Sequence, residues 1–224
     1  MVTTRVTVLR GGPSSEYEVS MSTGAGVLAA LKELGYTVQD VIISKRGEWL
    51  VNGVVKKPEV ALMVTDVAFI AMHGAYGEDG TVQTILERLH IPFTGSNSFP
   101  SRLAFNKDAT KRLLREHDIK LPRHVRMTRD AIADTHEIVA TLRTSFGPRY
   151  VLKPTTSGSS HGVVMIDTPE ALTAAIYAML EEYDECMIEE RIIGTEATCG
   201  VLEHFRGEEL YALPPIENVP IHHR

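Results

Sequence analysis

The chain has 224 residues, 43% of them hydrophobic, which is enough to bury one large core or two smaller ones. Its formal net charge is -6 and its lysines and arginines are scattered, so it lacks the basic surface expected of a nucleic-acid-binding protein. Glycine and proline are not in excess and no fixed-period repeat is visible, which disfavours fibrous and disordered classes and leaves a globular α/β protein with a small-molecule substrate.

The cysteines and the apolar stretches bear on the cellular compartment. Cys186 and Cys199 have no CxxC partner, which argues against a zinc site and a disulfide scaffold and favours a reducing compartment. The most apolar stretch, residues 61–72, is interrupted by Thr65 and Asp66 and is too short to span a bilayer. We therefore expect a cytoplasmic protein without a membrane partner.

The first segment predicts a strand, a glycine turn and a helix. Residues 6–9 form a β-rich run that stops at Gly11-Gly12. Ser15 and Glu18 match a capping box, apolar residues then recur at helical spacing, and Gly35 supplies a C-cap. The glycine turn is therefore expected at the carboxyl edge of a sheet, where ligands of open α/β sheets gather.

The elements that follow continue this alternation. Residues 37–44 predict a strand, and residues 49–56 predict a hairpin around an Asn-Gly turn. Residues 67–72 form a continuous apolar run typical of a buried parallel strand, which delivers His73 to its carboxyl end. A helix and a short strand at residues 91–94 come next, so the pattern predicts right-handed βαβ units.

The pattern of residues changes after about residue 97, and we place a domain boundary in the linker at residues 95–100. The later helices are expected at residues 106–117, through residues 132–142, and after the capping pair Thr168-Pro169. The later strands are expected near residue 125 and at residues 150–154, 163–166, 186–193 and 209–213.

Two features of this second part suggest a nucleotide. The glycine-serine loop, residues 155–162, has small residues that let backbone N–H groups approach an anion, although alone it is more often an ordinary hairpin. Lys153, at the preceding strand end, favours a phosphate-binding role without any Walker or GxGxxG pattern. Glu189 and Glu196 flank a turn where a nucleoside would fit, but such glutamates are more often solvated strand residues.

The histidine loop, residues 73–80, is more specific. Three glycines surround His73, Glu78 and Asp79, and the loop lies between a predicted buried strand and a predicted helix, as a rigid functional loop would. All three side chains are possible metal ligands, but no further ligand has suitable spacing.

These motifs together resemble the D-alanine:D-alanine ligase family. HGAYGEDGTVQ at residues 73–83 is similar to its N-terminal signature, except that Thr84 follows where a smaller residue is usual. GGPSSEYEVS at residues 11–20 resembles its opening motif, and VLKP with GSSHG at residues 158–162 resembles its phosphate segment. GTEAT at residues 194–198 resembles its GxExT strand. Four motifs in the family's order make accidental similarity improbable.

The resemblance implies an α/β ATP-grasp fold. An N-terminal doubly wound parallel-sheet domain that binds substrate is expected at residues 1–97, and a central α+β ATP-grasp lid domain at residues 98–190. Residues 191–224 are expected to begin a C-terminal domain that is incomplete in this sequence. The family's reaction joins two D-alanines at the expense of ATP through an acylphosphate, for peptidoglycan precursors, and a homodimer is expected.

The resemblance also implies roles in the substrate site. Glu16 is expected to bind the ammonium group of the first D-alanine, and Ser159 to join it in a hydrogen-bonded chain, so both are candidate catalytic residues. His73 is expected beside the substrate carboxylates. A carboxylate suits an ammonium group, and an imidazole donates to carboxylate oxygen. The alternative for Glu16 is an acid in a first helical turn, favoured by the helix dipole.

For ATP, the resemblance implies contacts from two lysines, the glycine-serine loop and the strand that follows it. Lysines suit phosphates because they offset the charge that builds during phosphoryl transfer. Glu190 stands where the family usually has a lysine, which departs from the adenine-binding pattern. The expected ATP-binding residues are Lys107, Lys153, Ser157, Gly158, Ser159, Ser160, Glu189, Ile192 and Glu196.

Metal ligands are missing from the sequence. Phosphoryl transfer of this kind uses Mg²⁺ (or Mn²⁺) held by carboxylate and amide oxygens. The family supplies an Asp and a Glu-x-Asn segment, and nothing after Gly200 matches them. We therefore expect the metal ligands beyond residue 224, in a continuation of roughly 80 to 100 residues that completes the third domain.

Two hypotheses of different class stay open at this stage. One is a peptide ligase whose second substrate is D-alanine, D-lactate or D-serine, since the residues that discriminate them in the family lie in a later loop. The other is a non-catalytic module that binds a nucleotide or an amino acid.

Overall fold

The computed structural model describes residues 4–219. The chain divides into two compact units, Met1–Glu190 and Arg191–Arg224. Within the described residues, no helix is both long and apolar enough to cross a membrane. The boundaries of the three predicted domains remain a prediction.

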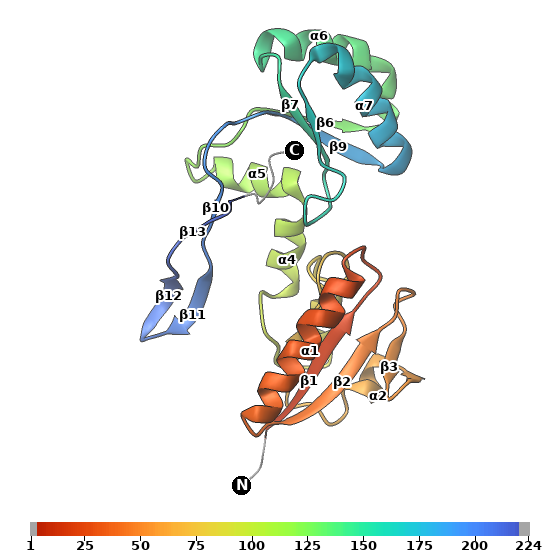
Figure 1. Cartoon of the computed structure of the whole chain (residues 1–224), viewed down its shortest axis with the longest axis vertical. Helices are drawn as coiled ribbons and strands as arrows, with labels where there is room; N and C mark the ends of the chain where they lie inside the picture. Colours follow the sequence, from red (N-terminus) through yellow and green to blue (C-terminus); the bar gives the residue numbers. More distant parts are fainter. Residues whose placement is uncertain (1–3, 220–224) are drawn as a thin grey trace. The chain divides into compact units, whose positions relative to one another are not determined.

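The first half of the larger unit is built on a five-stranded sheet with the strand order β4-β3-β2-β1-β5 (Figure 1). Strand β1 pairs in parallel with β2 and with β5, whereas β3 and β4 add an antiparallel hairpin. The elements are β1 (Arg5–Gly11), α1 (Tyr17–Glu33), β2 (Thr37–Ile43), β3 (Trp49–Val51), β4 (Val54–Lys56), α2 (Pro58–Ala61), β5 (Val67–Ile70) and α3 (Thr81–Arg88).

Successive residues of β1 point to opposite faces of this sheet, and both faces are covered. Val8 packs with Leu28 of α1 on one face, where Figure 1 shows α1 along β1. Leu9 packs with Trp49 and Leu86 on the other face. Strands that are buried on both faces need apolar residues at successive positions, which explains the continuous apolar runs in the sequence. The predicted doubly wound architecture of this sheet is therefore confirmed.

Some local predictions for this half were wrong. The capping box fails because α1 begins at Tyr17, with Glu16 at the N-cap and no side-chain cap. The Ser14 hydroxyl instead accepts a hydrogen bond from the Glu16 N–H at 3.1 Å, so the serine one position earlier forms the turn. The strand predicted at residues 91–94 is reduced to a single parallel bridge between Ala68 and Phe93.

The second half of the larger unit contains an antiparallel sheet with the order β6-β9-β7-β8. Its core face packs against helices α6 and α7 through residues such as Leu142, Leu152, Ile176 and Ile188 (Figure 1). The elements are α4 (Ser98–Phe105), α5 (Lys107–Arg115), β6 (His124–Thr128), η1 (Arg129–Asp134), α6 (Thr135–Ser145), β7 (Tyr150–Pro154), β8 (Val164–Ile166), α7 (Pro169–Glu182) and β9 (Glu185–Glu190).

The predicted elements of this half are confirmed with two changes. Asn106 caps α5, because its side-chain oxygen accepts a hydrogen bond from the Ala109 N–H at 2.9 Å. Residues 98–100, predicted as linker, form the first turn of α4, whose Pro100 is compatible with a helix start. The strand predicted at residues 186–193 ends at Glu190.

The smaller unit consists of two short antiparallel pairs, β10 with β13 and β11 with β12. The predicted strand at residues 209–213 is β12, and it forms a hairpin with β11. Nearly all of the described residues of the smaller unit are exposed. The strands are β10 (Ala197–Thr198), β11 (Val201–Phe205), β12 (Glu208–Ala212) and β13 (Ile216–Glu217).

We predict that Gly11→Ala destabilises the protein more than Gly35→Ala. Both glycines have left-handed backbone, with φ of 87° and 82°, so the conformational strain of about 1–2 kcal/mol is matched. A Cβ at Gly11 would also lie 2.3 Å from the Ile43 carbonyl oxygen, whereas one at Gly35 meets nothing within 4 Å. The clash should add about 1–3 kcal/mol to the loss in the free energy of unfolding, measured by urea denaturation. Equal losses would contradict the close approach of the turn to β2.

Candidate active site

Two loops meet at the carboxyl ends of β1 and β5. The Ser14 hydroxyl donates a hydrogen bond to the His73 carbonyl oxygen at 2.7 Å, which ties the glycine turn to the histidine loop. A Cβ at Gly74 would lie 2.8 Å from Glu16 Oε2 and 3.0 Å from Ser14 Cβ, so both side chains approach this glycine closely. The structure therefore brings Glu16 and the backbone beside His73 together.

The His73 imidazole is positioned from both sides. Its Nε2 lies 3.0 Å from the Thr23 hydroxyl of α1, and its Nδ1 lies 3.7 Å from Glu78 Oε1. The two contacts use different ring nitrogens, so they fix the ring plane. His73 thus stands within the histidine loop and against α1, and its expected place beside the substrate carboxylates stays a prediction.

Hydrogen bonds to the Asp79 carboxylate make the histidine loop rigid. Its two oxygens accept from the Tyr76 N–H at 2.8 Å and from the Thr81 N–H at 2.9 Å. Tyr76 has a positive φ of 73°, an unfavourable conformation for a bulky residue. The Trp49 indole N–H donates to the Tyr76 hydroxyl at 2.9 Å, which anchors the strained residue to β3.

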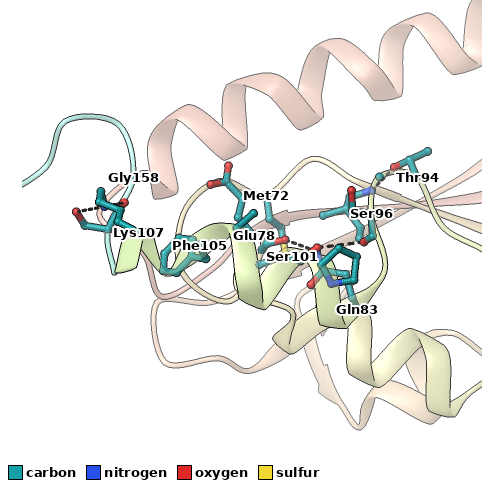
Figure 2. A pocket seen from close by; sticks show the side chains of 15 residues that line it. Met72, Glu78, Gln83, Thr94, Ser96, Ser101, Phe105, Lys107 and Gly158 are labelled. Atoms are coloured by element: carbon teal, nitrogen blue, oxygen red, sulfur yellow. Dashed lines mark hydrogen bonds between the residues drawn. The ribbon is translucent and has the colours of Figure 1, made fainter. Parts of the chain in front are cut away.

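The glycine-serine loop joins β7 and β8. Ser159 and Ser160 have positive φ values of 51° and 59°, so the loop turns sharply through two left-handed residues. Lys107 Nζ donates a hydrogen bond to the Ser157 carbonyl oxygen at 2.6 Å (Figure 2). An ammonium group and a loop of small residues therefore lie in direct contact, and groups of both kinds can bind an anion.

The glycine-serine loop also lies beside the Glu16 and Glu78 carboxylates. A Cβ at Gly158 would be 3.5 Å from Glu16 Oε2 and 3.7 Å from Glu78 Oε2. Ser159 itself is exposed, and among the described residues no hydrogen bond joins it to Glu16. The Glu16–Ser159 chain therefore stays a prediction, whereas the proximity of the loop to Glu16 is a structural fact.

Two cavities adjoin Ser157 and Gly158 of the glycine-serine loop. One of about 460 Å³ is lined by Glu78, Gln83 and Lys107 together with the loop, and Figure 2 shows these side chains around it. The other, of about 320 Å³, is lined by Glu16 and Gly74. Ser157, Gly158 and Phe105 line both cavities, so the loop forms a shared wall.

The sheet β6-β9-β7-β8 presents charged side chains on the face opposite its core. Alternation along β9 places Ile188 in the core and Glu189 on the other face, next to His124 of β6 in the register. Glu189 Oε2 lies 2.5 Å from Lys153 Nζ, and Glu189 Oε1 lies 2.8 Å from Lys111 Nζ of α5. The predicted residues Lys153 and Glu189 are thus in contact with each other.

Burial and charge act in opposite directions on these groups. Burial raises the pKa of Glu189, but its hydrogen bonds and charge interactions with Lys111 and Lys153 outweigh burial and lower it overall. Burial lowers the pKa of Lys107, repulsion from Lys153 lowers it further, and Glu189 partly offsets both. Each of these ammonium groups therefore gains from a further anion at the site, such as a phosphate.

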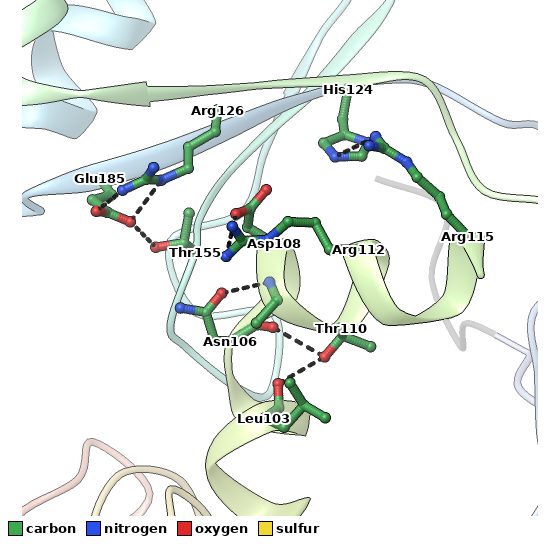
Figure 3. A network of polar contacts seen from close by, with 11 residues as sticks. Leu103, Asn106, Asp108, Thr110, Arg112, Arg115, His124, Arg126, Thr155 and Glu185 are labelled. Atoms are coloured by element: carbon green, nitrogen blue, oxygen red, sulfur yellow. Dashed lines mark hydrogen bonds and ion pairs between the residues drawn. The ribbon is translucent and has the colours of Figure 1, made fainter. Parts of the chain in front are cut away.

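A second polar network supports the helix that carries Lys107. Arg126 pairs with Glu185, which also accepts a hydrogen bond from the Thr155 hydroxyl at 3.3 Å (Figure 3). The Lys107 N–H donates to the Thr155 carbonyl oxygen at 2.9 Å, so the start of α5 is joined to the start of the glycine-serine loop. This network fixes the position of the two segments that hold the phosphate-binding candidates.

The remaining predicted ATP residues belong to the smaller unit. Ile192 is 64% exposed, and the Glu196 carbonyl oxygen accepts a hydrogen bond from the Asn218 N–H at 2.8 Å. Their expected contacts with adenine and ribose stay predictions. Among the described residues, no group of three or more His, Cys, Asp or Glu side chains is arranged to hold a metal ion.

Sequence reasoning missed Lys111. It follows Lys107 by one helical turn on α5, at the (i, i+4) spacing that places two side chains on one face. Its residue exposure is only 8%, which is unusual for a lysine without a functional or structural partner. The repeated lysine on one helical face was the available signal.

The comparisons with known proteins agree with this arrangement. The chain matches the family described as D-ala D-ala ligase N-terminus over residues 5–61 and 55–96, and the one described as D-ala D-ala ligase C-terminus over residues 113–222. A D-alanine–D-alanine ligase of Aquifex aeolicus is 37% identical over 96% of this chain and 67% of its own length. The chain spans 61% to 67% of the length of such curated relatives.

Solved structures show the same fold. The D-alanine-D-alanine ligase of Coxiella burnetii has a TM-score of 0.83 and 26% identity, covering 97% of this chain and 71% of that one. The Bacillus anthracis ligase complexed with ATP has a TM-score of 0.76 and 28% identity, covering 98% and 68%. The VanG D-Ala:D-Ser ligase of Enterococcus faecalis has a TM-score of 0.79 and 25% identity, covering 96% and 69%.

These findings define the fold class first and then the family. The two sheets, the glycine-serine loop and the likeness to these structures establish an ATP-grasp fold, as the motifs predicted. With both of its family segments matched, the chain belongs to the D-alanine–D-alanine ligase family.

We predict that Tyr76→Phe destabilises the histidine loop. The change removes the acceptor for the indole N–H of Trp49, which is only 3% exposed, and a buried donor without a partner costs about 1–3 kcal/mol. The free energy of unfolding can be followed by the fluorescence of Trp49, the single tryptophan of the chain. Tyr36→Phe, at a tyrosine 42% exposed, is the control and should change little. A loss no greater than that of the control would show that the Trp49–Tyr76 bond does not stabilise the loop.

Proposed function

We propose that this protein contributes to the ATP-dependent ligation of two D-alanines into D-alanyl-D-alanine. The observation that carries the proposal is the convergence of Glu16, the histidine loop and the glycine-serine loop in one compact unit. These segments carry the motifs of the family to which the chain belongs. A carboxylate for an ammonium group thus lies next to a loop suited to phosphates.

The proposed chemistry needs no covalent bond to the enzyme. A carboxylate oxygen of the first D-alanine attacks the γ-phosphorus of ATP, and the bond from this phosphorus to the β,γ-bridging oxygen breaks. ADP is released, and the acylphosphate of D-alanine is formed. The amine of the second D-alanine then attacks the acyl carbon, phosphate departs, and the amine loses a proton. Glu16 would orient the ammonium group of the first D-alanine, and His73 would donate to a substrate carboxylate.

The residues present fit ATP as a substrate. Lys107 contacts the glycine-serine loop and Lys153 lies on the same charged sheet face as Glu189, so two cations are available for phosphates. The small residues Ser157, Gly158, Ser159 and Ser160 leave backbone N–H groups free to approach anions. Glu189, Ile192 and Glu196 are proposed to meet the nucleoside.

The described residues do not fit a Mg²⁺ or Mn²⁺ site. No group of three acidic, histidine or cysteine side chains is arranged for a metal within residues 4–219. The proposed roles of Lys107 and Lys153 therefore rest on their own charges.

The proposal extends to the setting of the reaction. Ligation that consumes ATP and D-alanine for cell-wall precursors suits the cytoplasm, where we propose that the protein works. We also propose that it acts as a homodimer, in the expectation that the family's assembly applies to this chain. Size-exclusion chromatography with light scattering tests the second point, and a monomeric mass would exclude it.

A second candidate is ligation of D-alanine to D-serine or D-lactate. The observation that favours it is the likeness to a D-Ala:D-Ser ligase structure, which covers 96% of this chain. Release of phosphate from ATP in the presence of D-alanine alone, or of D-alanine with D-serine or D-lactate, separates the candidates. Nucleotide binding without phosphate release in any mixture would favour a non-catalytic binding module.

We predict that Lys153→Ala weakens nucleotide binding more than D-alanine binding. The loss of one charge-assisted contact should cost about 1.5–3 kcal/mol of binding free energy. Calorimetric titration with a non-hydrolysable ATP analogue measures it, and Lys120→Ala at an exposed lysine is the control. Unchanged affinity in Lys153→Ala would remove this residue from the nucleotide site.

We predict that Glu16→Gln impairs capture of the first D-alanine and leaves binding of the ATP analogue intact, because an amide lacks the charge that pairs with ammonium. The measurement is D-alanine affinity by calorimetry. Glu18→Gln, at a side chain that is 80% exposed in the first turn of α1, is the matched control. If both variants bind D-alanine like the wild type, Glu16 serves only to begin α1.

A further inference from the structure

Glu189 shares its two carboxylate oxygens between two lysines of different elements. Lys111 of α5 lies 2.8 Å from Oε1, and Lys153 of β7 lies 2.5 Å from Oε2. The three side chains are 10%, 20% and 6% exposed for Lys111, Lys153 and Glu189. Each lysine therefore contacts a different oxygen of the Glu189 carboxylate. If one lysine moves away, the contact between the other lysine and its oxygen is kept.

The two lysines differ in what else surrounds them. Lys111 Nζ is also 3.4 Å from the Pro122 carbonyl oxygen, so it is enclosed between α5 and the segment before β6. Lys153 is the more exposed of the two, and Lys107, whose ammonium contacts the glycine-serine loop, repels it. Lys153 is thus the cation that gains most from moving toward an added phosphate.

Movement of Lys153 toward a phosphate would remove one of the two positive charges that stabilise the buried Glu189 carboxylate. A charged group this deeply buried is strongly destabilised when it loses its only partner. In this cluster Glu189 keeps Lys111 when Lys153 departs, so one positive charge still neutralises it. The geometry thus provides a fixed cation and an exchangeable one.

We propose that Lys111 is a positioning residue for nucleotide binding: it holds Glu189 through one carboxylate oxygen, so that Lys153 can leave the other oxygen for the phosphates. The proposal rests on the proposed nucleotide-binding function. It differs from a merely structural role of Lys111, which would affect folding but would not depend on the charge state of Glu189.

The pH dependence of binding separates these two roles. Glu189 is faced by Lys111 and Lys107 of α5, Lys153 of β7 and His124 of β6. Without Lys111, departure of Lys153 leaves Glu189 buried and unpaired, so its pKa rises on nucleotide binding and a proton is taken up. The nucleotide affinity of a variant that lacks the Lys111 charge should therefore recover as pH falls. His124 and the nucleotide phosphates titrate in the wild type as well. The informative quantity is therefore the ratio of the variant's nucleotide affinity to that of the wild type at each pH.

The test compares the wild type with Lys111→Met and Lys111→Arg, and with Lys120→Met as the matched control at an exposed lysine. Calorimetric titration with a non-hydrolysable ATP analogue is carried out between about pH 5.5 and pH 8. Lys111→Met should bind about tenfold or more weakly at pH 8, and its deficit should shrink toward pH 5.5. Lys111→Arg and Lys120→Met should stay near the wild type. Lys111→Gln replaces Lys111→Met if thermal unfolding shows that the methionine variant does not fold.

Several outcomes would overturn the proposal. Wild-type affinity in the variant without the lysine charge, or a deficit of equal size at every pH, would assign Lys111 a structural role only. An equal deficit in Lys120→Met would show a general charge effect. A wild-type protein that does not bind the ATP analogue would instead refute the proposed nucleotide-binding function, which is distinguishable because no variant is needed to see it.

Discussion

The pairing of one buried carboxylate with two lysines organises the candidate nucleotide site. Glu189 lies on a strand in the middle of the second sheet, and its charge can be kept there only because Lys111 and Lys153 approach its two oxygens. One lysine comes from a helix and the other from a neighbouring strand, so the pairing also fixes α5 against the sheet. The position of Lys107, at the beginning of α5, follows from this contact.

The same strands supply both the core and the charged face. Side chains alternate along β7 and β9, so Leu152 and Ile188 enter the core against α6 and α7, while Lys153 and Glu189 face the other way. The core therefore sets the register on which the lysine–carboxylate contacts depend. A slip of one residue would place the charges in the core and the apolar side chains at the site.

The part of the site that is proposed to bind D-alanine depends on backbone conformation rather than on charge pairing. Gly11 and Gly74 allow approaches that a Cβ would block, and Tyr76 is held in a left-handed conformation by Asp79 and Trp49. Local strain of this kind persists only where the surroundings over-determine it. The rigid histidine loop is thus a product of contacts that join β3, β5 and α3.

Much of the architecture was predictable because hydrophobic periodicity and turn residues act locally. The strands, the major helices and the glycine turns follow from alternation, helical spacing and positive-φ glycines, and the four motifs predicted the family. The capping box at Ser15 failed because a side chain two positions before Glu16 made the competing hydrogen bond. Helix α4 was missed because Pro100 and the polar residues before it are typical of a linker, and none of the residues of α4 is buried in a core.

The sequence by itself determined the fold class, the family and the candidate residues. Only the tertiary structure decided which charges meet, because pairing across elements depends on sheet register and helix placement, which no local pattern encodes. It joined Lys153 to Glu189, added Lys111 as a second partner, and tied Tyr76 to Trp49. The physical reason is burial. Water solvates the charge of an exposed lysine, whereas a lysine enclosed between a helix and a sheet requires an anionic partner.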